Sequence, residues 1–294
     1  MDIQTRAYGY ALLSVALWST VASAFKITLR RLPFDVMLLF AAFFSSLLLF
    51  AVLNLQGKLP LLVKMGRREW LRSSLLGFLN PFLYYLILFK AYDLLPAQEA
   101  QALNYTWPIT VVILSSFILG QRLTGRKLAG IIVGFGGVLT VATHGDPLSL
   151  TFSNIPGAAL AVGSSVVWAL FWLYNVKDPR DEVLKLFVNF CFGTVFVGLF
   201  ALVGGAEITL DAMGLLGALY IGAFEMGITY VFWLKALSLS RSTAQVSNLV
   251  FLSPFLSLFF ISRIVGEVIR PSTLLGLALI VAGILIQGRQ KVVD

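Results

Sequence analysis

Four polar side chains fall inside apolar stretches of this sequence, where a bilayer or a protein core makes them costly. Glu225 lies near the middle of one apolar segment, and Thr229 follows it by four residues. Asn80 and Tyr84 have the same spacing in an earlier segment. Because residues four apart share a helix face, we expect two facing helices to present polar patches at similar depth. Polar and ionisable groups at such depth usually mark a pathway or a binding site.

Glu225 is the residue with the most chemistry to offer in these segments. Its carboxyl group would either bind a substrate ammonium or carry a coupling proton. The competing interpretation is a structural carboxyl group that is hydrogen-bonded to an Asn, Thr or Ser side chain of a neighbouring helix. We favour the functional interpretation, because buried carboxyl groups in such helices are expensive to keep.

Aromatic side chains are the second signal. Trp18, Trp107 and Trp168 lie near the centres of apolar segments, although tryptophan in membrane proteins usually gathers at the interfaces. An indole N–H at that depth needs a partner, and a polar cavity provides one. Rings around a cavity would stack on an apolar substrate, or on an ammonium group by cation–π attraction. Plain helix packing and lipid contact are the alternatives.

Two prolines interrupt apolar runs. Pro108 and Pro254 are expected inside helices, where a proline removes a hydrogen bond and bends the helix. Tyr105 precedes Pro108 by three residues and is predicted to face the same cavity. The bends would serve either as hinges or as static kinks that shape the site.

The segments that carry these residues are long and apolar. Hydrophobic residues make up 59% of the 294 positions and charged residues 12%, whereas soluble domains carry about 25% charged residues. A membrane-spanning helix needs about 20 mostly apolar residues. We therefore predict an all-α polytopic membrane protein whose lipid-embedded helices are 8–29, 34–55, 70–92, 97–119, 126–143, 155–176, 183–203, 211–236, 242–262 and 271–288.

The positive charges predict the orientation. With ten spans, 16 of the 22 Lys and Arg residues lie on the side of the N-terminus. The positive-inside rule makes that side cytoplasmic, which places both termini inside a bacterial inner membrane. The net charge of +8 is thus no sign of nucleic-acid binding. Arg6, an apolar run and Ala22-Ser23-Ala24 imitate a secretory signal. We expect this segment to be retained, because its removal would leave nine spans.

The sequence also repeats itself. Tyr85 and Lys90 recur after 145 residues as Tyr230 and Lys235. Matches at a shift of 146 are Pro108 and Pro254, Gly120 and Gly266, Gly130 and Gly276, and Gly137 and Gly283, and Trp18 and Trp168 match at a shift of 150. We therefore divide the chain into repeats 1–146 and 147–294. Five spans per repeat make the two repeats inverted, an arrangement that suits alternating access with a site between the halves.

This pattern resembles a known family. Each repeat ends in Pro-(eleven)-Gly-Gln/Glu-(eight)-Gly-(six)-Gly, as in the drug/metabolite transporter superfamily, EamA branch. Within that branch the chain most resembles the YddG-type bacterial amino-acid exporters, in length and in its aromatic-rich spans. The resemblance implies a basket in which helices one, three, four, six, eight and nine surround a central cavity, with helices five and ten at the periphery.

We expect an inner-membrane exporter of aromatic or neutral amino acids. Other metabolites or drugs, such as nucleobases and hydrophobic cations, are the alternative. A phosphate substrate is disfavoured, because phosphate would need an Arg or Lys at mid-membrane depth. The candidate substrate-binding residues are Trp18, Asn80, Tyr84, Tyr105, Trp107, Trp168, Glu225 and Thr229, and the candidate hinges are Pro108 and Pro254.

Several other classes are not expected. No G-x-S-x-G or H-E-x-x-H stretch occurs, which argues against an intramembrane enzyme. Cys191 and His144 are the only Cys and His residues, so a Cys/His metal site is not expected, and neither is a cofactor. The sequence leaves a monomer and a homodimer equally open.

Overall fold

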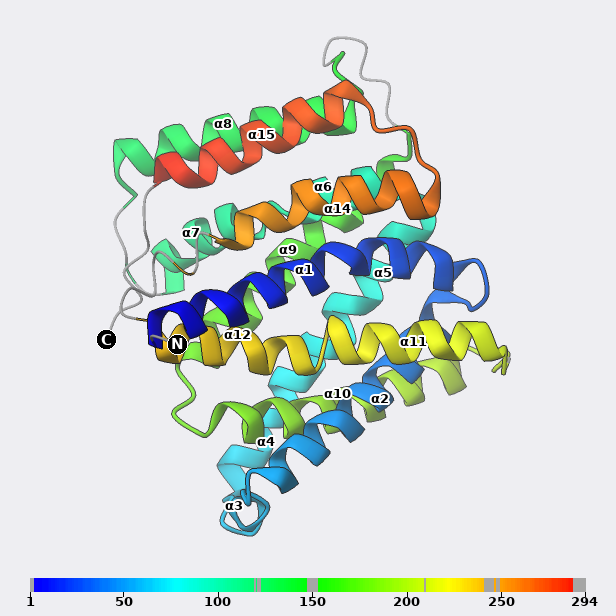
Figure 1. Ribbon diagram of the computed structural model, residues 1–294, viewed down its shortest axis with the longest axis vertical. Coiled ribbons are helices and arrows are strands. Elements are labelled where there is room, and N and C mark those ends of the chain that lie inside the picture. The colour runs from blue at the N-terminus through cyan, green and yellow to red at the C-terminus, as the bar shows by residue number, and fades with distance from the viewer. Residues whose placement is uncertain are drawn as a thin grey trace.

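A computed structural model describes residues 3–118, 120, 123–146, 153–208, 210–240, 246 and 249–287 of the chain. These residues form helices, turns and loops, and no strand (Figure 1). The elements of the first half are α1 (Ile3–Leu29), α2 (Phe34–Leu55), α3 (Pro60–Val63), α4 (Arg67–Gly77), the π-helical turn η1 (Phe78–Leu83), α5 (Tyr84–Leu94), α6 (Ala97–Asn104), α7 (Trp107–Ile118) and α8 (Gly125–Ala142). Those of the second half are α9 (Ile155–Val176), α10 (Glu182–Val203), α11 (Ala212–Phe224), α12 (Ile228–Leu239), η2 (Leu249–Leu252), α14 (Ser253–Phe260), η3 (Ile261–Val265) and α15 (Pro271–Gln287).

Seven helical segments of the described chain are long and apolar enough to cross a membrane. Each coincides with one of the ten predicted spans. The remaining three predicted spans are shorter or broken: 97–119 is divided into α6 and α7, and Leu249–Val265 and Pro271–Ile286 are shorter apolar helices. Part of the predicted span 242–262 lies outside the described residues.

The third and eighth predicted spans are both interrupted near their middle. In the third, Asn80 has extended backbone angles (φ −148°, ψ 120°) within the π-helical turn η1. In the eighth, α11 ends at Phe224 and α12 begins at Ile228, so Glu225 lies in the break. Breaks in membrane helices free backbone groups and are typical of substrate sites. Two of the four polar residues singled out from the sequence, Asn80 and Glu225, thus lie at these interruptions.

The prolines lie at helix starts rather than inside helices, contrary to expectation. Pro108 is the second residue of α7, and Pro254 is the second residue of α14. In the first turn of a helix the missing N–H costs nothing, because that N–H has no partner within the helix. The fourth span is broken ahead of its proline, between Asn104 and Trp107, and the 3-10 turn η2 precedes the other.

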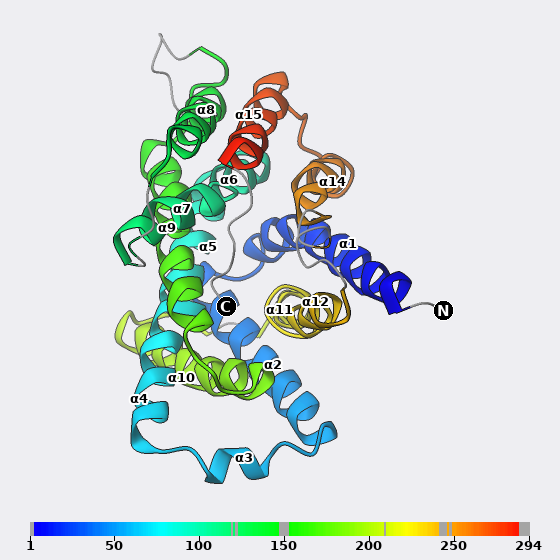
Figure 2. The same cartoon turned by 90° about the vertical axis from the view of Figure 1, so that its left-hand side faces the viewer.

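Several helix–helix contacts of the first half have an equivalent in the second half. Figures 1 and 2 show α8 and α15 side by side at one end of the molecule and α2, α4 and α10 at the other. Between them, α1 packs against α12 as α9 packs against α5, and α1 packs against α14 as α9 packs against α7. In both pairs, a helix of one half makes the contact that its counterpart in the other half makes.

Glycines bring α8 and α15 together. A Cβ atom on Gly137 would lie 2.5 Å from the backbone oxygen of Gly276, and one on Gly283 would lie 2.5 Å from the backbone oxygen of Gly130. The order of these pairs makes the two helices antiparallel. Such contacts between small residues let membrane helices approach closely. All four glycines belong to the repeat seen in the sequence.

Candidate functional site

Aromatic rings from both halves of the chain meet between the broken spans. Trp168 on α9 lies 4.6 Å from Tyr84 on α5 and 6.3 Å from Tyr230 on α12, measured between ring centroids. Trp18 on α1 lies 5.9 Å from Tyr230 and 5.4 Å from Trp233. Trp18 and Trp168, related by the repeat, therefore contact the same tyrosine. We call these five residues the aromatic cluster.

The Glu225 carboxyl group borders this cluster. The Tyr85 hydroxyl donates a hydrogen bond of 3.1 Å to Glu225 Oε1, and Tyr85 packs edge-on against Tyr84 at 4.7 Å. Tyr85 is fully buried, whereas Glu225 is partly exposed. A hydroxyl from the first half thus binds a carboxyl group from the second half at the edge of the rings. The arrangement offers one carboxyl group beside apolar ring faces, which suits a cation with an apolar body.

A short hydrogen-bond chain extends from the cluster towards the fourth span. The Tyr84 hydroxyl donates to Asn104 Oδ1 at 3.4 Å, and Asn104 Nδ2 donates to Ser164 Oγ at 2.9 Å. Asn104 is the last residue of α6, directly before the break. Neither Asn104 nor Tyr85 is among the site residues predicted from the sequence. The recurrence of Tyr85 as Tyr230 is the sequence signal that points to these two tyrosines, whereas no such signal marks Asn104.

The remaining predicted site residues are not members of the aromatic cluster. Asn80 and Thr229 are fully buried, and their side-chain polar atoms have no hydrogen-bond partner among the residues that the structure describes. Tyr105 donates a hydrogen bond of 2.7 Å to the backbone oxygen of Val250, which ties the break of the fourth span to the 3-10 turn of the ninth. Trp107 is half-buried and packs both on the apolar contact between α7 and α9 and on the larger core that contains Trp168 and Tyr84.

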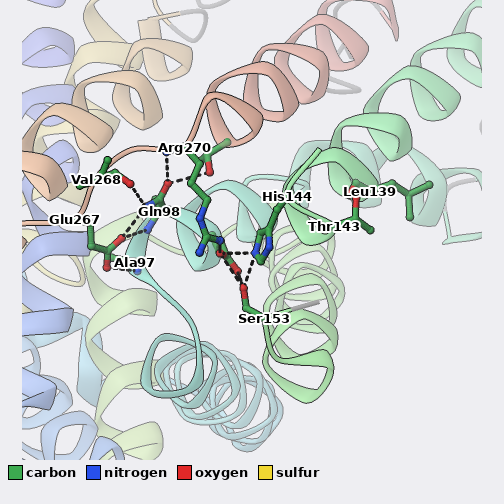
Figure 3. Close-up of polar contacts among 11 residues, drawn as sticks. Ala97, Gln98, Leu139, Thr143, His144, Ser153, Glu267, Val268 and Arg270 are labelled. Carbon is green, nitrogen blue, oxygen red and sulfur yellow. Dashed lines mark hydrogen bonds and ion pairs between the residues drawn. The ribbon is translucent and has the colours of Figure 1, made fainter. Parts of the chain in front are cut away.

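A second polar cluster lies at one end of the helices, where α6 begins (Figure 3). The buried Glu99 carboxyl group contacts Arg270 and accepts a hydrogen bond of 2.7 Å from Ser153, and His144 Nε2 lies 3.0 Å from it. Glu267 accepts hydrogen bonds from the first backbone N–H groups of α6, at Ala97 (2.7 Å) and Gln98 (3.2 Å). This cluster joins the start of α6 to the loop before α15.

Ion pairs gather at the opposite end of the helices, between α9 and α10. Arg180 binds Asp178 in a bidentate manner, at 2.9 and 2.6 Å, and Arg72 on α4 lies 3.7 Å away. Burial works to raise the pKa of the Asp178 carboxyl group, but the hydrogen bonds and charge of Arg180, together with Arg72, outweigh it and lower the pKa. Asp178 therefore stays charged at neutral pH. Nearby, Asp181 forms an ion pair with Lys58 at 2.6 Å.

The helices are long and apolar, and a carboxyl group and several aromatic rings lie between the helices that are interrupted near their centres. These features define a multi-pass α-helical membrane protein. The chain belongs to the EamA-like transporter family, which matches residues 5–143 and again residues 155–288. It is thus a membrane transporter. The resemblance read from the glycine and proline pattern is confirmed at the level of the family.

Relatives with curated descriptions share about a quarter of their residues with this chain. A probable amino-acid metabolite efflux pump of Salmonella typhimurium is 26% identical over 94% of this chain and 92% of its own length. The aromatic amino acid exporter YddG of Ancylobacter novellus is 27% identical over 38% of this chain and 39% of its own length. An uncharacterized transporter of Archaeoglobus fulgidus is 27% identical over 92% of this chain and 93% of its own.

The fold also matches a solved structure. A protein crystal structure superimposes with a TM-score of 0.66 at 20% identity, over 97% of this chain and 96% of the other. At that identity the match concerns the fold alone.

Proposed function

We propose that this protein exports aromatic or neutral amino acids across a bacterial inner membrane. The observation that carries the proposal is the pairing of Tyr85 with Glu225 at the edge of the aromatic cluster. The carboxyl group would receive the substrate ammonium, and the rings of Trp168, Tyr84 and Tyr230 would receive its apolar side chain. The names of the Salmonella and Ancylobacter relatives point to the same substrate class.

Two inverted five-helix repeats, 1–146 and 147–294, would move this site between the two sides of the membrane. Three observations support this part of the proposal. The family matches the chain twice, over 5–143 and 155–288. The first helix of each half, α1 or α9, packs against a helix of the other half, α12 or α5 respectively. The α8–α15 contact pairs repeat-related glycines in antiparallel order, as a two-fold axis requires.

Nucleobases, hydrophobic cations and other drugs remain the second candidate substrates. The observation that favours them is again the combination of one carboxyl group with several ring faces, since a lipophilic cation needs no more than that. Amino acids differ in also carrying a carboxylate. The first N–H groups of a helix have no acceptor within the helix, so the start of α12, beside the break, would receive that carboxylate.

Counterflow in proteoliposomes separates these candidates. Vesicles loaded with one unlabelled compound would be tested for uptake of the labelled compound, with phenylalanine, leucine, a nucleobase and a lipophilic cation as the panel. We expect accumulation with phenylalanine and leucine that is absent from protein-free vesicles. Accumulation with the nucleobase or the cation and none with either amino acid would contradict the proposal.

A further inference from the structure

A groove on the outer surface of α4 has a charged end and an apolar wall. Its volume is about 560 Å³. It lies where α4 and η1 pass the end of α9 and contains none of the predicted substrate-binding residues. We call it the α4 groove; its lining residues are Arg68, Leu71, Arg72, Leu75, Leu76, Phe78, Leu79 and Tyr174.

Polarity changes in one direction along the α4 groove. Arg68 lies in the first turn of α4, and Arg72 follows one turn later on the same face. Leu75 and Leu79 continue that face deeper into the span. Leu71 and Leu75 are 62% and 61% exposed, so their side chains are available for contact. A phospholipid has the same order of polarity from the membrane surface towards the bilayer centre: its phosphate comes first and its acyl chains follow.

The arginines of the groove are poorly neutralised by the protein. Arg68 has no ion-pair or hydrogen-bond partner among the described residues. Arg72 lies 3.7 Å from Asp178, but both carboxylate oxygens of Asp178 are already bound by Arg180. The carboxylate of neighbouring Glu69 is turned to the backbone N–H of Gly66, 2.7 Å away. Like charges four residues apart on a helix repel each other, and an anion between them removes that repulsion.

We propose that the α4 groove binds an anionic phospholipid, with its phosphate between Arg68 and Arg72 and an acyl chain along Leu71, Leu75 and Phe78. Arginine forks recognise phosphate oxygens in a bidentate manner, and basic pockets between membrane helices bind anionic headgroups. In the orientation predicted from the Lys and Arg distribution, the lipid belongs to the cytoplasmic leaflet. The site is independent of the transported substrate.

Native mass spectrometry of the detergent-purified full chain tests the site. The protein would be titrated with phosphatidylglycerol or with phosphatidylcholine of identical acyl chains. We expect preferential retention of phosphatidylglycerol and about five-fold weaker binding in Arg68→Gln, the effect of one arginine near a phosphate. Arg67→Gln is the matched control, because Arg67 is exposed on the same turn and does not line the groove. It should retain wild-type affinity.

Two further arms exclude a simple anion site. Leu75→Gln keeps both arginines and removes part of the apolar wall, so it should weaken phosphatidylglycerol binding as well. Inorganic phosphate should fail to displace the lipid at millimolar concentration. Equal retention of the two lipids, equal losses in Arg67→Gln and Arg68→Gln, or displacement by phosphate would each overturn the proposal. Each variant changes an exposed side chain, and its elution on size exclusion reports that it folds.

Discussion

At the scale of single residues, the central feature is a carboxyl group that belongs to one half of the chain and a hydroxyl group that belongs to the other. Glu225 accepts its hydrogen bond from Tyr85, and Tyr85 and Tyr230 are repeat-related. A substrate ammonium that reaches Glu225 would replace or share that bond. A charge-assisted hydrogen bond is worth about 1.5–3 kcal/mol, so the identity of this one side chain should be visible in transport.

Glu225→Gln keeps the shape of the side chain and its capacity to accept a hydrogen bond, but it neither carries charge nor releases a proton. If the carboxylate binds the substrate ammonium, as we propose, exchange and net flux of α-amino substrates should both fall by about tenfold or more. If it carries a coupling proton instead, exchange should survive while the response to a pH gradient disappears. Both would be measured in proteoliposomes.

Glu207→Gln serves as the charge-matched control, because Glu207 is an exposed residue of the loop between α10 and α11. It should transport like the wild type. Wild-type exchange together with unchanged pH dependence in Glu225→Gln would show that the carboxyl group is structural, and the site assignment would have to be abandoned.

At the scale of elements, the sequence could predict where helices run and where they are disturbed, because apolar length and buried polar residues are local properties. Asn80 and Glu225 lie deep within their apolar segments, and both are found at helix breaks. Trp107 lies at a similar depth, and it packs on the α7–α9 contact as well as on the core that holds Trp168. Depth is readable from one segment, whereas the direction in which a side chain points depends on the partner helix.

Contacts between distant segments could not be predicted from the sequence. Glu99 is buried by Arg270, His144 and Ser153, which come from three separate places in the chain. Each of these residues alone looks like an ordinary loop or helix-end residue. Asn104 likewise gains its role only because Tyr84 and Ser164 lie on either side of it. No periodicity or residue spacing in the sequence predicts contacts of this kind.

The contact between α8 and α15 yields an element-scale prediction. Gly137→Ala would place a Cβ atom 2.5 Å from the backbone oxygen of Gly276, and backbone cannot move aside cheaply. We expect a loss of about 1–3 kcal/mol in stability, as for other overpacked contacts, and a lower apparent Tm in detergent. The matched control is Gly136→Ala, one residue earlier, where no atom lies within 4 Å of the added Cβ.

Gly136→Ala should be neutral, or stabilising by up to about 1 kcal/mol, because alanine is the better helix former. Intrinsic fluorescence during heating would follow both variants. An equal Tm for the two would mean that α8 and α15 do not approach as closely as their glycines indicate.

At the scale of the whole molecule, orientation follows from charge. The excess of Lys and Arg on the N-terminal side predicts that both termini are cytoplasmic. A reporter enzyme that is active only outside the cytoplasm, fused after Asp294, should therefore stay silent, and the same reporter inserted after Gly205, between α10 and α11, should be active. Activity of the C-terminal fusion would make the number of spans odd, and the inverted-repeat proposal would be wrong.

The α8–α15 contact also has a consequence for biogenesis. Gly276 is synthesised 139 residues after Gly137, which at about 5–20 residues per second is on the order of ten seconds. Throughout that interval the glycine face of α8 has no α15 to meet, and lipid or the insertion machinery must cover it. The end of the molecule that holds this contact therefore cannot close until α15 has left the ribosome. A chain that is truncated before α15 would leave the glycine face of α8 without its packing partner, and membrane quality control would encounter that exposed face.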